Sequence, residues 1–135
     1  MARARMTGFE DLEKMFRILG AADEMAIKAV DDAVPILEKN LKAEIMSAAE
    51  HPTGELTSHI GTTKAKKNEY GVFAVVKPDE DYVDRLRWFD IGHHDINGDW
   101  HKGKGVRQRA VNASKDACRK IIEEHVERFA DEAAR

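Results

Sequence analysis

The chain has 135 residues, 42% hydrophobic and 35% charged, and this length and composition predict one globular domain, residues 1–135, rather than a disordered tail. With 22 basic and 25 acidic residues the formal net charge is −3, so overall charge gives no reason to expect nucleic acid or anionic lipid as a partner. No apolar run is long enough to predict a membrane span or a secretory signal. The single cysteine, Cys118, excludes an internal disulfide and fits synthesis in a cytoplasm.

The first predicted element is a short amphipathic helix over residues 9–19. Thr7 and Glu10 have the spacing of a capping box, in which the hydroxyl caps an early amide and the carboxylate reaches back. Gly20 is a suitable helix stop. The apolar positions recur at helical spacing and are Phe9, Leu12, Phe16 and Leu19.

A second, longer helix is predicted over residues 23–49. Pro35 lies inside it and is expected to cause a kink or to divide it into two helices in series, because proline lacks an amide and clashes with the preceding turn. One apolar stripe keeps its phase across the proline and is expected to face the core. Its members are Ala26, Val30, Ala33, Leu37, Leu41, Ile45 and Ala48.

The centre of the chain changes from helical to β patterning after residues 51–54. Residues 71–76 are the best strand candidate, preceded by a predicted turn at Lys67-Asn68-Glu69. Residues 82–91 fit either a strand or a helical turn. The expected fold class is therefore α+β: a small antiparallel sheet of three or four strands packed against the long kinked N-terminal helix and a C-terminal helix.

The C-terminal part predicts a tight turn followed by a long helix. Asn97-Gly98 is a favoured turn pair and is expected at a loop tip. The helix is expected over residues 106–134, where Cys118 would be a small buried hydrophobe rather than a nucleophile. The positions expected to be buried are Ala110, Ala113, Ala117, Ile121, Val126 and Phe129.

The candidate functional segment is FDIGHHDINGDWHKGKG, residues 89–105, which holds three of the six histidines. One hypothesis is a metal site of a small metal-dependent hydrolase, with ligands drawn from Asp90, His93, His94, Asp95 and His101. Their spacing matches no established zinc motif, and adjacent histidines on an extended chain point in opposite directions. The favoured hypothesis is a pliable, glycine-rich loop that contacts another protein through Ile96 and Trp100.

The remaining polar motifs do not favour catalysis or a cofactor. Gly103-Lys104-Gly105 lacks the first glycine and the Ser or Thr of a phosphate-binding loop. A group of lysines around the expected strands is typical of a solvated edge, and few aromatic residues accompany it, so nucleic acid is not an expected partner. Those lysines are Lys64, Lys66, Lys67 and Lys77.

Four short segments occur in an order that resembles a known family. They are Gly8-Phe9, then HPTGELTSHI at residues 51–60, then WFDIG at residues 88–92, and then VRQRAV at residues 106–111. This order resembles the small tail-component proteins of long-tailed bacteriophages, the gene-product-ten-like group that joins head and tail or completes the tail. The chain departs from that pattern with Asp90 in place of the usual glutamate and His93 in place of threonine.

The resemblance implies a non-enzymatic structural protein of a phage or prophage virion, located in the tail or neck after synthesis in the bacterial host cytoplasm. It implies a ring-shaped homo-oligomer that also binds other tail or neck proteins, with no cofactor and no membrane partner. Trp88, Phe89, Asp90 and Gly92 would then form a structural junction. His93, His94, Ile96 and Trp100 would belong to a loop that docks onto neighbouring subunits.

Overall fold

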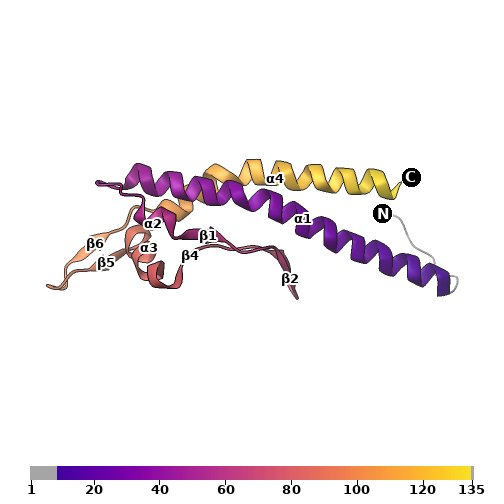
Figure 1. The fold of residues 1–135 in the computed structure, drawn as a ribbon, viewed down its shortest axis with the longest axis horizontal. Coiled ribbons are helices and arrows are strands. Elements are labelled where there is room, and N and C mark those ends of the chain that lie inside the picture. The colour runs from indigo at the N-terminus through magenta and orange to yellow at the C-terminus, as the bar shows by residue number, and fades with distance from the viewer. Residues whose placement is uncertain (1–8, 135) are drawn as a thin grey trace.

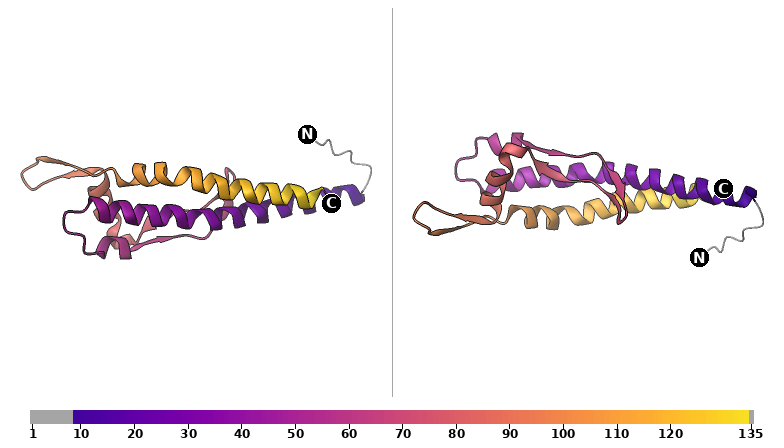
Figure 2. Two further views of the ribbon diagram at one scale, coloured as in Figure 1. Left: turned by 90° about the horizontal axis from the view of Figure 1, so that it is seen from above. Right: turned by 90° about the horizontal axis from the view of Figure 1, so that it is seen from below.

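Two long antiparallel helices form the body of an elongated molecule (Figure 1). The structure is a computed structural model that describes residues 9–134, with side chains for residues 21–134. Helix α1 spans Phe9–Ala48 and helix α4 spans Val106–Ala133, which are 40 and 28 residues long. At a rise of 1.5 Å per residue they extend about 60 and 42 Å. Figure 2 shows α4 lying along α1, with the smaller elements gathered beside the pair.

Helix α1 is continuous, so the predicted stop at Gly20 is wrong. An interior glycine costs a helix only about 1 kcal/mol relative to alanine, which the turns on either side can offset. The helix also continues through Pro35, which lies on its exposed side, so the alternative of two helices in series is wrong as well. Thr7 of the proposed capping box lies outside the described residues, as do the side chains of residues 9–20.

Among the described side chains, four polar contacts set the antiparallel register of α1 and α4. Partner numbers fall along α1 as they rise along α4, and the pairs are Glu44–Arg109 (3.0 Å), Asn40–Ser114 (2.8 Å), Ala33–Cys118 (3.4 Å) and Asp32–His125 (2.7 Å). Ser114 is buried, and its hydroxyl accepts a hydrogen bond from the Asn40 amide. Burial raises the pKa of the Cys118 thiol, whose Sγ donates to the Ala33 carbonyl.

The buried side of α4 differs from the predicted one. Ala110 is buried, and Ile121 and Phe129 are half-buried, as expected. Ala113, Ala117 and Val126 are exposed, so those predictions are wrong. Ser114 and His125 face α1 instead, because each finds a polar partner on that helix. Cys118, expected as a small buried hydrophobe, also faces α1 and is half-buried. The α1 stripe is better predicted: Ala33, Leu41 and Ile45 are buried, and Ala26, Val30, Leu37 and Ala48 are half-buried.

Within residues 9–134 the β structure consists of three separate two-stranded antiparallel ladders rather than one sheet of three or four strands. They pair β1 (Ile60–Thr62) with β4 (Val76–Pro78), β2 (Lys66–Asn68) with β3 (Gly71–Phe73), and β5 (Gly92–His94) with β6 (Trp100–Lys102). The strand predicted over residues 71–76 is split between two ladders. The predicted turn at Lys67-Asn68-Glu69 is shifted to Glu69-Tyr70, because Lys67 and Asn68 pair in β2.

The apolar core lies at one end of the helix pair. Its buried residues are Leu41, Ile45, Ile60, Leu86, Val106 and Ala110. The short elements α2 (Glu55–Ser58), η1 (Glu80–Tyr82) and α3 (Val83–Asp90) surround it. The ambiguous segment 82–91 is thus mainly helical, and Leu86 is its buried residue.

None of the helices described in residues 9–134 is both long and apolar enough to span a membrane.

Candidate functional site

The predicted structural junction connects α3, the β5–β6 hairpin and the start of α4. The Asp90 side chain, 10% exposed, accepts a hydrogen bond from the backbone amide of Arg107 at 3.0 Å and pairs with the Arg107 guanidinium. Because amides in the first turn of a helix lack intrahelical partners, this carboxylate also stabilises the positive end of α4. Phe89 is half-buried and packs against the core, while Trp88 is 48% exposed.

Backbone hydrogen bonds join the base of the hairpin to α3. The amides of Gly103, Lys104 and Gly105 donate to the carbonyls of Ile91, Phe89 and Asp90 at 3.1, 2.7 and 2.9 Å. Such a close approach leaves little room for side chains. A Cβ at Gly103 would overlap the Asp90 backbone, and a Cβ at Gly92, where φ is +124°, would lie 2.7 Å from the Trp100 ring. The junction therefore requires glycine at both positions.

Asp95 organises the tip of the hairpin. Its Oδ1 accepts the amides of Asn97 and Asp99, each at 2.9 Å, and its Oδ2 lies 2.9 Å from His101 Nε2. Gly98 occupies the left-handed region at φ +84°, as the predicted Asn97-Gly98 turn requires. The His101 hydrogen bond, followed by the Asp99 amide, holds the pKa of Asp95 below its usual value. The tip is thus a closed turn in which both oxygens of the Asp95 carboxylate already have hydrogen-bond partners.

The hairpin presents different side chains on its two faces. His93 stacks on His101 with ring centroids 5.3 Å apart and lies 5.9 Å from Trp88. On the other face, His94 meets Trp100 edge-on at 5.0 Å. The side chain of Ile96 at the tip is fully exposed, and Trp100 is 53% exposed. The two adjacent histidines therefore point in opposite directions, as expected for an extended chain.

These positions do not assemble the metal site considered from the sequence. Asp90 is paired with Arg107 at the start of α4, and His94 contacts the Gly98 carbonyl at 3.1 Å. Among the described side chains, no group of three or more His, Cys, Asp or Glu residues is placed to hold a metal ion. The arrangement offers exposed aromatic and aliphatic surface on a braced hairpin.

A cavity of about 280 Å³ lies between α3 and the hairpin and was not predicted. Its lining residues are Arg85, Trp88, Phe89, His93, Lys102 and Lys104. The aromatic rings supply apolar surface, the cations surround it, and no acidic residue lines it. Lys102 is the last residue of β6 and Lys104 follows the strand, so no strand period in the sequence indicates that the two cations lie together.

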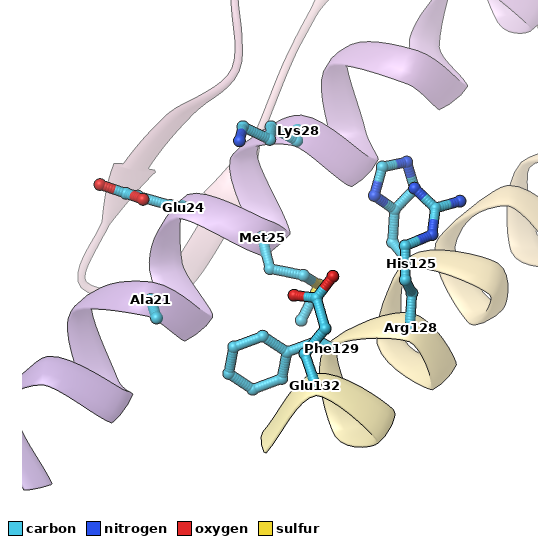
Figure 3. A pocket seen from close by; sticks show the side chains of 8 residues that line it. All are labelled: Ala21, Glu24, Met25, Lys28, His125, Arg128, Phe129 and Glu132. Carbon is cyan, nitrogen blue, oxygen red and sulfur yellow. The ribbon is translucent and has the colours of Figure 1, made fainter. Parts of the chain in front are cut away.

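A second cavity, also of about 280 Å³, opens where α1 and α4 separate near the end opposite the hairpin. Figure 3 shows Met25 of α1 and Phe129 of α4 coming together between the two helices, with Glu132 beside them and Arg128 near His125. This cavity has mixed polarity and belongs to the imperfectly closed helix seam.

The lowered pKa of Asp95 predicts a pH dependence of the hairpin tip. A depressed carboxyl pKa stabilises the folded turn above the usual carboxyl pKa, and that contribution is lost as pH falls through the folded value. The backbone amide NMR signals of Asn97 and Asp99 should therefore move and broaden as the pH falls below about 4. An Asp95→Asn variant keeps an acceptor for both amides without the titration, so an unchanged acid transition in that variant would contradict the assignment.

Comparisons of this chain with family models, with curated proteins and with solved structures give no match.

Proposed function

We propose that this chain is a structural protein of a bacteriophage or prophage, in the tail or the head–tail connection. It acts by self-association, in a ring of identical copies, and by docking onto other tail or neck proteins. The observation that carries the assembling role is the group of exposed apolar side chains around α3 and the hairpin. The attribution to a phage particle rests on the ordered sequence segments that resemble the tail-component family.

The accessible surface is 10421 Å² for a mass of 15.2 kDa. A compact monomer of this mass exposes about 7,100 Å². Part of this difference belongs to residues 1–20 and 135, whose side chains the structure does not describe, and the elongated helix pair adds to it. A standard interface covers about 800 Å² on each partner. A ring subunit needs two such contacts, one on each side.

The exposed apolar side chains at the hairpin end support the same role. Ile96, Trp100, Trp88 and Ile91 are all about half or more exposed, although they lie within one region around α3 and the hairpin. Aromatic and aliphatic groups that remain accessible on a rigid support are typical anchors of protein interfaces. Because β5 and β6 pair only with each other, the hairpin also leaves two open strand edges.

The last three of the four segments that carry the resemblance come together in the fold, whereas Gly8 lies outside the described residues and Phe9 begins α1. Thr53, Gly54 and Leu56 line a depression together with Ile45 and Phe89. The third and fourth segments are joined through the Asp90–Arg107 contact described above. The convergence of these three segments on one folded end is what a shared structural unit requires, and it supports applying the resemblance to this end of the molecule.

The hairpin tip provides a direct test of the assembling role. We expect purified protein to form a discrete oligomer in light scattering coupled to size exclusion, and Ile96→Ser to weaken that oligomer roughly tenfold or more, because burial of one isoleucine contributes about 1.5–3 kcal/mol. Ile96→Leu, which keeps an apolar side chain, is the matched control. A wild-type chain that stays monomeric at every concentration would contradict self-association.

The place of the chain in a particle needs its own measurement. Immunogold labelling or mass spectrometry of virions from the native host should locate the chain in the tail or neck. Its absence from intact particles would rule out the virion role. Stoichiometric zinc, manganese or nickel in purified protein, lost on replacing His93 and His94 with alanine, would instead favour the metal-dependent alternative.

A further inference from the structure

We propose that the outer face of the C-terminal half of α4 in one copy docks into the cavity between α3 and the β5–β6 hairpin of a second copy. This inference rests on the proposed self-association and names the two surfaces that meet. One surface is an apolar cavity with a cationic rim, and the other is a helix face with one apolar and one acidic stripe.

The receiving surface is the cavity of about 280 Å³ described above. Trp88 and Phe89 give it an apolar floor, and its rim carries positive charge. Arg85 already binds Glu55 at 3.0 Å. Within residues 21–134, in contrast, no acidic side chain pairs with the ammonium groups of Lys102 or Lys104. Two cations therefore remain available to an incoming carboxylate.

The inserting surface is on the last turns of α4. Ile122 and Val126 are 38% and 47% exposed, and Ala130 continues their stripe at four-residue spacing. Residues four apart lie on the same side of a helix, one turn above the other. A second stripe, shifted by one residue, is acidic and exposed and consists of Glu123, Glu127 and Asp131. None of these three acids forms an ion pair with another described residue.

The two surfaces complement each other in polarity and charge. An amphipathic helix that places an i, i+4 apolar pair in a hydrophobic groove is an established mode of recognition. Here Ile122 and Val126 would cover the Trp88 and Phe89 rings. The neighbouring acidic stripe would then reach the lysines at the rim, where opposite charges set the register of docking more than its affinity.

The positions of the two surfaces on the molecule favour contact between copies. The hairpin projects at one end and the C-terminus of α4 lies toward the other, so one copy cannot satisfy its own cavity (Figures 1 and 2). A contact that uses two different surfaces is heterologous, and its repetition produces a closed ring or an open filament. The inference thus specifies a head-to-tail contact for the proposed assembly.

Charge reversal tests the contact in the full-length chain by analytical ultracentrifugation. Lys102→Glu with Lys104→Glu, and separately Glu123→Lys with Glu127→Lys, should each weaken self-association roughly tenfold or more. Each pair lies on exposed surface, so circular dichroism should show an unchanged fold. Mixing the two variants should restore assembly with alternating copies, because each native surface then meets a native partner and each reversed surface meets a reversed one. All four changes in one chain should restore self-association.

Further variants make the test specific. Ile122→Ser with Val126→Ser should weaken association without any change of charge, whereas Lys64→Glu with Lys66→Glu, a matched reversal of two other exposed lysines, should leave it unchanged. A wild-type oligomer unaffected by both charge-reversal variants would overturn this contact and leave the proposed self-association standing. A wild-type chain that never associates would overturn both.

Discussion

Replacing Gly92 with alanine is expected to destabilise the fold by about 3 kcal/mol, through backbone strain added to steric overlap. Gly92 is buried with φ at +124°, and a Cβ there would overlap the His101 carbonyl oxygen and crowd the Trp100 ring. The backbone oxygen cannot move away without breaking the ladder between β5 and β6. Urea denaturation followed by circular dichroism measures the change in the free energy of unfolding.

Gly98→Ala is the matched control for this prediction. Gly98 also has a positive φ, +84°, but a Cβ there would meet nothing within 4 Å. Its substitution should therefore show only the cost of backbone strain, about 1–2 kcal/mol. Equal losses for the two variants would mean that the crowding around Gly92 contributes nothing.

Leu86→Ala is expected to cost about 2–5 kcal/mol, because it removes transfer free energy and leaves a cavity. Leu86 is 3% exposed and belongs to the core cluster with Leu41, Ile45 and Val106. A domain is typically stable by only about 5–15 kcal/mol, so this loss should lower the urea midpoint substantially. Val83→Ala on the same helix, where the side chain is 48% exposed, should change stability by less than about 0.5 kcal/mol. Similar midpoints for both variants would show that Leu86 is not a core residue.

The helices could be predicted from the sequence because their apolar residues repeat with a clear period. The bounds of α4 and much of the α1 stripe follow from that period alone. The rotation of α4 does not, because hydrophobicity favours Ala113 and Ala117 over their neighbours. The helix instead turns Ser114 and His125 inward, where Asn40 and Asp32 satisfy them. These hydrogen bonds join residues far apart in the chain, so they cannot be predicted from the local pattern of apolar residues.

The strands and the candidate site were harder to predict for a related reason. The turn at Asn97-Gly98 has a local signature and is found where expected. The division of residues 71–76 between two ladders depends on Thr63, whose hydroxyl accepts the Val75 amide at 2.9 Å. Likewise, Lys102 becomes part of a cationic rim only because β6 pairs with β5 opposite Gly92. Both features depend on which residues of two strands pair, and that pairing is set by the assembled fold.

The position of the core has a consequence for motion along the helix pair. Burial along α4 declines from Val106, Ala110 and Ser114, which are buried, to Ile121 and Phe129, which are only half-buried. The free energy of local opening should fall in the same direction, so amide hydrogens exchange faster toward the C-terminus than near the hairpin. The hairpin end of the helix pair should thus be rigid, and the C-terminal end of α4 should open more readily. A second copy that binds the C-terminal part of α4 must order it, and the conformational entropy lost in this way reduces the binding free energy. A single contact between copies should therefore stay reversible until several copies have assembled.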